Sequence, residues 1–491
     1  MNHALSEYLT AQFYAWEKRG RGWHVFDQAV ELESDFIPFF GHYPPETTTQ
    51  IDDGVRPRFF PGLQEALGIF KKRTGTSIGE EAYGKLEELY TVNGYIYENP
   101  NPVIELTINF DKETRIVFEH IEQLLLMLST SAGIVGFEIF GTREKITIQF
   151  VCTGRDANNF RSYISTYAPD VGIHESPGNL KSSIDFDQIV WATDLGLRDE
   201  FMRLLRVWSK FDPDPLAGCI AALESISAGE FGMLQILFQA AVNPWAESVQ
   251  RAITDGGGGA FFADAPDMLP LSKEKISSPL YATVVRAIGQ ANIEDRAKTI
   301  SENIAQSLIA FHRTGSNTLI PLGVPLSCDV EDLVARRSRR IGMLLNSNEL
   351  ASMVHIPDRS VVSPKLRVYA GKTKRVTTDV EGHSFELGVN SHLGQDAIAT
   401  LSDQHRLRHM HVIGATGTGK SSLLLNLITQ DIVQGRGVAV LDPHGDLIEE
   451  VIRQVPLERL KDVVLVDPSD SEYPIGLNYQ ISTSKVIRMA K

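Results

Sequence analysis

Gly414-Ala-Thr-Gly-Thr-Gly-Lys-Ser421 is the stretch that decides the fold of the C-terminal part of this 491-residue chain. The spacing Gly-x-x-x-x-Gly-Lys-Ser is typical of a phosphate-binding loop when a strand precedes it and a helix follows it. The apolar stretch His409–Ile413 predicts that strand, and Lys420–Gln434 predicts the helix because its apolar residues recur at helical spacing. The sequence therefore predicts a P-loop α/β domain that binds a nucleoside triphosphate.

Each position of this loop has a physical reason in phosphate binding. Glycine allows the dihedral angles that turn backbone N–H groups inward around a phosphate, and the N-terminus of the following helix adds its positive end. The lysine contacts the β- and γ-phosphates, and the serine hydroxyl ligates Mg²⁺. We expect ATP and Mg²⁺ as cofactors, with Ser421 as the Mg²⁺ ligand. The predicted nucleotide-binding residues are Gly414, Ala415, Thr416, Gly417, Thr418, Gly419, Lys420, Ser421 and Ser422.

A second candidate feature follows the predicted helix. The apolar stretch Val438–Leu441 predicts another strand, which ends in Asp442-Pro-His-Gly-Asp446. An aspartate at the end of such a strand can orient the Mg²⁺ shell, so Asp442 joins Lys420 as a candidate catalytic residue. The alternative is structural: the segment forms a turn in which Asp446 caps the helix predicted over 447–454. The sequence favours the turn and cap but leaves both interpretations open.

Upstream of the loop, strands and helices alternate in the order β-α-β-β-α-β, twice. The first copy has predicted strands at 103–110, 136–140, 145–152 and 171–174 and helices at 114–129 and 156–167. The second has strands at 183–191, 231–241, 281–288 and 319–322 and helices at 215–226 and 294–311, with an extra helix at Asp199–Phe211. This order predicts two ferredoxin-like (split βαβ) units. A single larger α+β domain is the alternative.

Composition excludes several classes of protein. The net charge of −15 argues against a surface coated by nucleic acid, so any DNA contact is expected to be local. The cysteines Cys152, Cys219 and Cys328 stand too far apart for a metal-ligand pattern. No apolar run reaches about 18 residues, so we expect no transmembrane helix. A basic run at Arg336–Arg340 indicates a solvated helix face, with a nucleic-acid contact as the alternative.

The residues around the loop resemble a known family. His409–Ser422 is similar to the P-loop segment of the HerA/FtsK superfamily of hexameric DNA-pumping ATPases. Further stretches resemble its conjugative branch, the type IV secretion coupling-type (TraG/TraD-like) ATPases, closely at Val438–Leu447, Asp462–Pro468 and Pro474–Asn478 and more loosely at Phe137–Ile139, Tyr167–His174 and Ala351–Pro357.

The resemblance implies a RecA-like motor core that forms a hexameric ring, hydrolyses ATP between subunits and moves DNA through the pore. It implies a secretion-channel or nuclease partner, and a cytoplasmic location, peripheral at the inner face of the membrane. Carried over residue by residue, Gly414, Gly417, Gly419, Lys420 and Ser421 match the nucleotide-binding residues of the family. Asp442 matches its aspartate after the second strand. Two alternatives stay open: a HerA-like helicase in DNA processing or defence, and a protein that binds nucleotide or a ring partner without turnover.

The chain also departs from the family. It holds no second apolar strand ending in Asp-Glu and no recognisable catalytic glutamate or arginine finger, so ATP hydrolysis is expected from the resemblance alone and the chain is expected to be a fragment of a motor. The predicted fold class is α/β and α+β multidomain: tandem ferredoxin-like units followed by a partial RecA-like P-loop α/β domain. The expected parts are an irregular region at 1–100, ferredoxin-like units at 101–180 and 181–330, a linker with short strands at 331–395 and the P-loop domain at 396–491.

Overall fold

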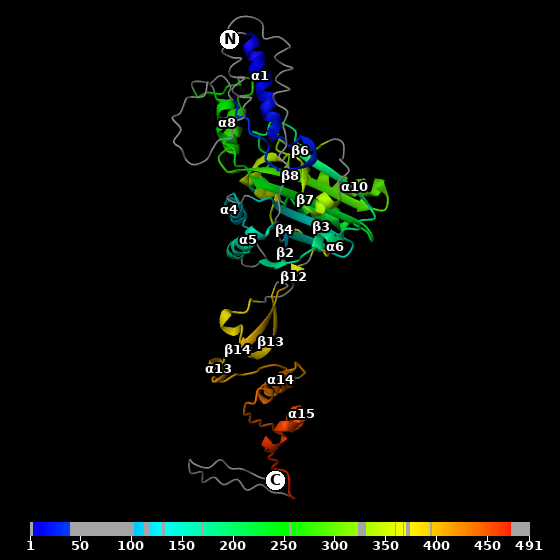
Figure 1. Ribbon diagram of the computed structural model, residues 1–491, viewed down its shortest axis with the longest axis vertical. Coiled ribbons are helices and arrows are strands. Elements are labelled where there is room, and N and C mark those ends of the chain that lie inside the picture. Colours follow the sequence, from blue (N-terminus) through cyan, green and yellow to red (C-terminus); the bar gives the residue numbers. More distant parts are fainter. Residues whose placement is uncertain are drawn as a thin grey trace. The chain divides into compact units, whose positions relative to one another are not determined.

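The computed structural model divides the chain into two compact units (Figure 1). Unit 1 comprises Met1–Lys372 with Leu393–Gln395, and unit 2 comprises Thr373–His392 with Asp396–Lys491. The boundary lies inside the segment expected as a linker, so the short strand predicted near residue 385 belongs to unit 2. The described residues are 3–39, 103–111, 117–129, 133–168, 171–254, 258–262, 264–322, 330–358, 360–366, 368–369, 374–392, 395–415 and 417–472.

One half of the main sheet of unit 1 consists of four antiparallel strands with two helices. In chain order these are β2 (Val103–Asp111), α4 (Phe118–Leu128), β3 (Val135–Gly141), β4 (Ile146–Thr153), α5 (Gly154–Tyr167) and β5 (Val171–Glu175). Their order across the sheet is β5-β2-β4-β3. Every residue of β3 and β4 is buried, and their β-branched and aromatic side chains suit strands that are covered on both faces.

The other half repeats this sequence of elements. It contains β6 (Ile189–Leu197), α7 (Ala217–Glu224), β7 (Phe231–Ala240), β8 (Leu280–Ala291), α10 (Glu294–Ser307) and β9 (Leu319–Pro321). Its strand order is β7-β8-β6-β9. Antiparallel pairing of β3 with β7, from Val135 opposite Phe238 to Gly141 opposite Gly232, joins the two halves into one large sheet. The single strand pair β3–β7 therefore makes a continuous sheet from two halves.

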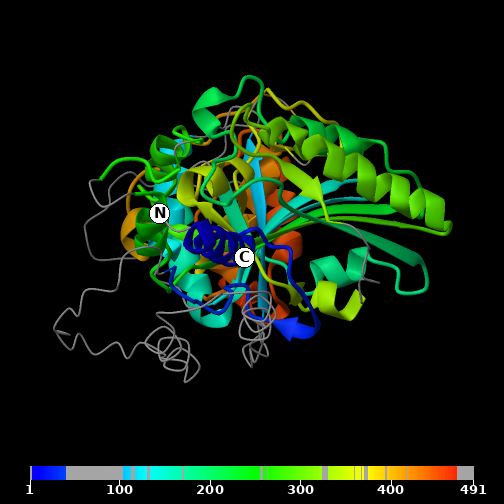
Figure 2. The ribbon, with the colours of Figure 1, turned by 90° about the horizontal axis from the view of Figure 1, so that it is seen from above.

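One face of this sheet is apolar and is covered by helices α4, α5, α7 and α10, and α10 is seen to lie along the strands in Figure 2. Two glycines opposite each other, Gly232 on β7 and Gly289 on β8, let the helices approach closely. A Cβ at Gly289 would lie 2.0 Å from the carbonyl oxygen of Ala297 in α10. A side chain there would push α10 away from the sheet, so glycine is required by the packing.

The opposite face carries a row of polar side chains that crosses six strands at one level. Thr107, Gln149, Glu138, Gln235, Arg286 and Asp194 stand opposite one another on β2, β4, β3, β7, β8 and β6. We call this row the polar ladder. Gln149 Nε2 and Gln235 Nε2 donate to the Glu138 carboxylate at 2.7 and 2.9 Å, and Arg286 Nε donates to Asp194 Oδ1 at 2.9 Å. Buried polar groups need such partners, and from β4 to β6 the neighbouring strands of the row supply them.

Residues 330–340, which we call the strap, cover the polar ladder. The strap contains α11 (Val330–Val334) and β10 (Ser338–Arg340), and Figure 2 shows α11 on the side of the strands opposite α10. Arg336 reaches Glu105 at 2.5 Å and Glu138 at 3.0 Å, and Arg340 reaches Asp194 at 3.0 Å. The interpretation of the basic run as a solvated helix face is therefore wrong for these two arginines, because carboxylates of the sheet bury them.

Two further strands belong to the main sheet: β11 (Met343–Asn346) pairs with β8, and β12 (Val368–Tyr369) pairs with β2. The remaining elements of unit 1 lie around the sheet. They are α1 (His3–Glu17), η1 (Lys18–Gly20), β1 (Val25–Val30), α6 (Asn179–Ser183), η2 (Trp208–Lys210), α8 (Trp245–Ile253), α9 (Met268–Lys275), η3 (Leu308–Phe311) and α12 (Ser347–Met353). No described helix combines the length and the apolar character needed to cross a membrane.

Further sequence predictions fail in unit 1, where the strand expected at 183–191 lies instead at Ile189–Leu197. Residues 3–39 are not irregular, because α1 packs Phe13 and Trp16 into an aromatic cluster with Phe39 and Trp245. The helix expected at Asp199–Phe211 is absent except for the 3₁₀ turn η2. Its apolar residues were read as a helical face, but they are buried through tertiary contacts of an irregular segment. The helix considered near residues 80–90 lies outside the described residues.

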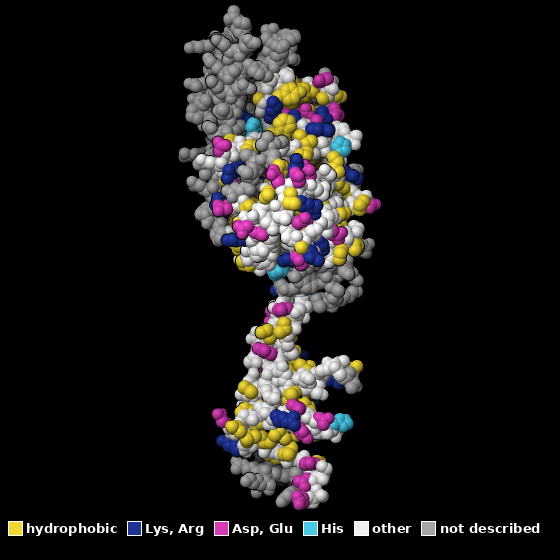
Figure 3. Space-filling view, turned by 90° about the vertical axis from the view of Figure 1, so that its right-hand side faces the viewer, with side chains coloured by type: hydrophobic (Ala, Val, Ile, Leu, Met, Phe, Trp, Pro, Cys, Tyr) yellow, Lys and Arg dark blue, Asp and Glu magenta, His cyan; other side chains and the backbone are white. Residues whose placement is uncertain are grey.

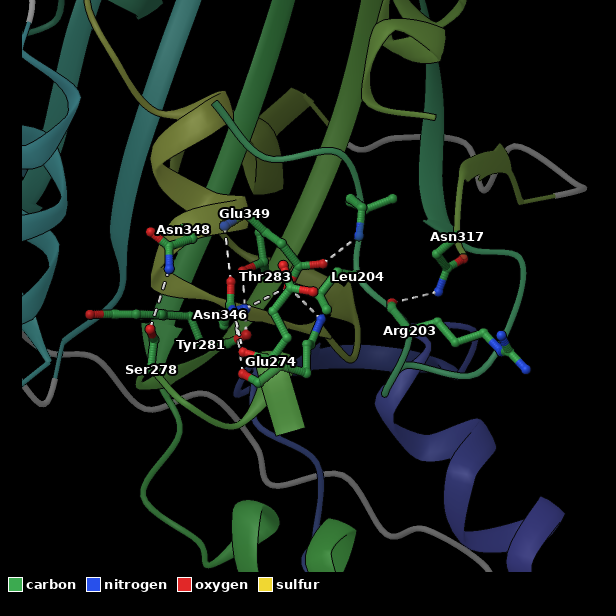
Figure 4. A network of polar contacts seen from close by, with 12 residues as sticks. Arg203, Leu204, Glu274, Ser278, Tyr281, Thr283, Asn317, Asn346, Asn348 and Glu349 are labelled. Carbon is green, nitrogen blue, oxygen red and sulfur yellow. Dashed lines mark hydrogen bonds and ion pairs between the residues drawn. The ribbon is translucent and has the colours of Figure 1, made fainter. Parts of the chain in front are cut away.

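A buried ion pair ties three further segments together (Figure 4). Lys275 of α9 and Glu349 of α12 are both fully buried, and Lys275 Nζ donates to Glu349 Oε2 at 2.5 Å. Glu349 also accepts hydrogen bonds from the backbone N–H groups of Asn346 and Leu205, and Asn346 caps α12. Burial lowers the pKa of Lys275, and the Glu349 carboxylate opposes that effect. The ion pair holds α12 and the segment around Leu205 against the end of α9.

The described part of unit 2 contains a two-stranded hairpin, one short helix and two longer helices. These are β13 (Phe385–His392), β14 (Gln395–Leu401), the short α13 (Asp403–Arg406), α14 (Lys420–Val433) and α15 (Asp446–Gln454), with 3₁₀ turns η4 (Thr378–Val380) and η5 (Leu457–Asp462). Both longer helices begin within one residue of their predicted start. The apolar segments expected as strands at 409–413 and 438–441 take part in no strand pairing within the described residues.

We expect Lys275→Met to lower the free energy of unfolding of unit 1 by about 3–5 kcal/mol, because it leaves the Glu349 carboxylate buried without a counter-charge. Adding Glu349→Gln should recover part of the loss, because glutamine is neutral and still accepts hydrogen bonds. All five tryptophans belong to unit 1, so tryptophan fluorescence in urea follows this unit alone. A single variant as stable as the parent, or a double variant less stable than the single one, would contradict this.

Candidate nucleotide-binding site

The predicted phosphate loop leads directly into the N-terminus of α14. Gly419 is the N-cap residue of this helix with φ +87°, and Gly417 has φ +80°, so both adopt the left-handed conformation that favours glycine. Gly414 packs too closely for a side chain, because a Cβ there would lie 2.6 Å from Thr418 Oγ1. Gly417 and Gly419 therefore adopt backbone angles that favour glycine, and Gly414 lies against the Thr418 side chain.

Lys420 folds back onto the loop. Its ammonium donates hydrogen bonds to the carbonyl oxygens of Gly414 and Ala415, each at 2.7 Å. Thr418 Oγ1 donates to the same Ala415 oxygen at 2.8 Å. The loop is thus closed around its own lysine, which places one positive charge against the backbone of the residues expected to surround a phosphate.

The serines expected to complete the site lie in the first turn of α14. Ser421 and Ser422 are exposed, and the structure records no hydrogen bond from the Ser421 hydroxyl to another described residue. No group of three or more His, Cys, Asp or Glu side chains among the described residues is placed to hold a metal ion. The Ser421 hydroxyl, in the first turn of α14, is the expected Mg²⁺ ligand together with phosphate oxygens. Thr416 lies outside the described residues.

Asp442, the candidate catalytic aspartate, is engaged as a cap. Its carboxylate accepts hydrogen bonds from the backbone N–H groups of His444 at 3.1 Å and Leu447 at 2.9 Å. These bonds hold the pKa of Asp442 below its ordinary value. The expectation that Asp446 caps the helix is wrong, because α15 already begins at Asp446 and the cap comes from Asp442. The Pro-His-Gly turn brings Asp442 to the first turn of α15.

The apolar segments beside the loop are open to solvent in unit 2. Ile413 is 82% exposed and Leu441 is 92% exposed, and the four residues Val463–Val466 are 40–58% exposed. Yellow hydrophobic side chains are accordingly visible on this unit in Figure 3. In a P-loop domain such segments are buried strands, so the described residues hold the loop and its helix without a paired sheet around them.

A set of residues that the sequence did not reveal holds the hairpin against α14. The guanidinium of Arg406 lies 3.8 Å from the centre of the Phe385 ring and bonds both carboxylate oxygens of Asp431 on α14, at 2.5 and 2.6 Å. Gln430 bonds both the N–H and the C=O of Glu386 on β13, each at 2.8 Å. These residues are 25 and 44 positions apart, and no local pattern could have indicated the pairs. They position the phosphate-loop helix.

Comparison with known families supports the chemistry of this site. Residues 396–480 match the family model described as Helicase HerA, central domain. Residues 115–261 match a model described only as a domain of unknown function, DUF8128. No curated protein matches the chain. The segment that carries the phosphate loop therefore supports a P-loop ATPase of the HerA/FtsK type.

Proposed function

We propose that this chain is the ATP-binding part of a ring-forming motor that moves DNA. The observation that carries the proposal is the loop Gly414–Ser421, with two left-handed glycines, a glycine without room for a side chain and a lysine held against the loop backbone. The family match over residues 396–480 supports the same class of ATPase. DNA as the substrate and the hexameric ring come from the resemblance of the loop segment to the HerA/FtsK superfamily.

Different residues of the loop would make different contributions to nucleotide binding. Backbone N–H groups near Gly417 and Gly419, together with the N-terminus of α14, favour an anion. Lys420 supplies a mobile positive charge that can leave the Gly414 and Ala415 carbonyls for a phosphate. Ser421 supplies a free hydroxyl for Mg²⁺. ATP with Mg²⁺ supplies the phosphoryl chemistry when it is bound.

The hydrogen bonds of the Asp442 carboxylate bear on whether this residue has a catalytic or a structural role. A place in the Mg²⁺ shell would require its carboxylate to give up hydrogen bonds to two backbone N–H groups. We therefore propose Asp442 as a residue that positions α15 beside the loop, with a catalytic role only in a state where those bonds are broken.

DNA contact in such a motor has to be local. The net charge is −15, and on the face shown in Figure 3 the described Lys and Arg side chains are interspersed with Asp and Glu. A duplex is bound by Lys and Arg gathered on one surface, so a pore formed by several copies is the expected place of contact. We propose a cytoplasmic motor, peripheral at the inner face of the membrane, of the conjugative coupling type.

We also propose that the sheet of unit 1 consists of two ferredoxin-like units joined edge to edge. What supports this is strand order: β5-β2-β4-β3 and β9-β6-β8-β7 are the same order, fourth-first-third-second, in the two halves. Both halves also place their two helices on one face.

A second candidate function is a HerA-like helicase in DNA processing or defence. The description of the matching family as the central domain of helicase HerA favours it. Both functions would use the same loop, so the neighbouring genes discriminate them: a nuclease gene indicates DNA processing, and relaxase and secretion genes indicate conjugation.

We expect Lys420→Ala to weaken Mg·ATP binding by about tenfold to a hundredfold, because a hydrogen bond to a charged group contributes about 1.5–3 kcal/mol. Isothermal titration calorimetry on the full chain measures this directly. Lys461→Ala is the control, since Lys461 is exposed in η5, away from the phosphate loop in sequence. Equal affinity of the Lys420→Ala variant and the parent would remove the basis of the proposed function.

Gly419→Ala should also weaken Mg·ATP binding, by roughly tenfold, because an L-residue at φ +87° costs about 1–2 kcal/mol and would shift the N-terminus of α14. Gly437→Ala is a matched control, since a Cβ there meets no atom within 4 Å and φ is not positive. Calorimetry on both variants gives the comparison. Similar affinities for the two variants would show that the loop conformation at Gly419 does not matter for binding.

A further inference from the structure

The strap, residues 330–340, completes the charge balance of the polar face of the sheet. The sheet contributes the carboxylates of Glu105, Glu138 and Asp194 but only one guanidinium, that of Arg286. All four side chains are at most 13% exposed. If the strap covered this face without its two arginines, the face would hold two buried negative charges in excess, which is costly in a medium of low dielectric constant. The strap supplies the two missing positive charges.

Arg336 provides the larger share of this compensation. Its Nε and Nη2 donate to the two oxygens of Glu138, each at 3.0 Å, and Nη2 also donates to Glu105 at 2.5 Å. Its Nη1 donates to the carbonyl oxygen of Val334 in the strap itself. One guanidinium therefore bonds two strands of the sheet and the strap at the same time.

The backbone of Arg336 is strained at the same position. Among the described residues it is the one non-glycine residue with a positive φ, +56°. Backbone N–H groups of Arg336 and Arg337 close this turn on the carbonyl oxygens of Leu333 and Asp332, as at a helix C-terminus. The turn directs the Arg336 side chain to the sheet, where the carboxylates anchor this end of α11.

The apolar packing of the strap is slight and separate from the main core. Leu333 of the strap belongs to a small cluster with Leu180 and Ile184 beside α6 and with side chains of the polar face such as Phe140 and Met233. The main core, with α4, α5, α7 and α10, lies on the other face. Segments with few apolar contacts open at lower cost than the core they cover.

We propose that the strap is a latched cover of the sheet, with Arg336 as the latch, and that it opens as a unit while the sheet and its helical face stay folded. Opening exposes the polar ladder together with Glu105, so that the three carboxylates of this face and the single Arg286 then face solvent. In sequence, the strap follows the second half of the sheet and precedes the segment that leads to unit 2. Arg336 and the carboxylates that it bonds all belong to unit 1, so this proposal does not rest on the proposed ATP site.

Hydrogen exchange of the full chain, followed by mass spectrometry, tests the latch. In Arg336→Gly the guanidinium is lost while glycine accepts the positive φ, so any change reports the side chain. We expect exchange in peptides covering 330–340 to rise by about tenfold or more, with the β7 and β8 peptides nearly unchanged. Arg337→Gln is the control, because the Arg337 side chain is 51% exposed and its guanidinium lies 3.9 Å from Asp332 in the strap itself.

A second variant keeps the test decisive if Arg336→Gly does not fold. Glu105→Gln removes one partner of the latch and leaves Glu138 in place, so it should loosen the same peptides to a smaller extent. Unchanged exchange in the strap of the folded variants would overturn the proposal. So would a rise of equal size in the strap, β7 and β8, because the strap would then be an inseparable part of the sheet.

Discussion

Three carboxylates and three arginines buried on one face of a sheet constrain the whole of unit 1. The carboxylates of Glu105, Glu138 and Asp194 come from both halves of the sheet, and the arginines come from the sheet and the strap. Removing a partner from such a set leaves a buried charge without compensation, which costs more than the set contributes as a whole. The pairing of β3 with β7 places Glu138 beside Gln235, and this brings the two halves into one polar network. The opposite face is stabilised by apolar packing. There the lack of a side chain at Gly289 sets how closely α10 approaches the sheet.

Unit 2 follows a different constraint, the dihedral angles of a few glycines. Gly417 and Gly419 turn the loop, and Lys420 fills the space that the loop encloses. The hairpin β13–β14 holds α14 through Arg406, Asp431 and Gln430, so the helix behind the loop is positioned from upstream. The apolar segments at 409–413, 438–441 and 463–466 are solvent-exposed and unpaired within the described residues. The unit thus presents a loop with two left-handed glycines directly before α14, without the sheet that normally buries the strands of such a domain.

Local sequence patterns correctly predicted the features that depend on interactions between residues close together in the chain. The helix at Lys420 and the glycine positions followed from spacing, and most strands of unit 1 followed from alternation and β-branched residues. The helix at 199–211 was wrong because burial there comes from distant segments. The prediction that Arg336 lies on a solvated helix face was wrong. A run of charges in the sequence does not show that carboxylates more than 190 positions away will bury one of its members. The cap of α15 by Asp442 instead of Asp446 depends on how a Pro-His-Gly turn folds, which a residue pattern alone does not fix. Arg406, Phe385 and Asp431 left no sequence pattern at all, because their contact exists only after folding.

The most direct measurement of nucleotide binding at Gly414–Ser421 is hydrogen exchange of the full chain with and without Mg·ATP, resolved by peptide. Backbone N–H groups that bind phosphate exchange more slowly, so the peptide covering residues 414–425 should gain protection while peptides of the unit 1 sheet do not change. Mg²⁺ alone should have no such effect. Unchanged exchange at 414–425 with saturating Mg·ATP, or protection confined to unit 1, would contradict the assignment of this loop as the nucleotide site.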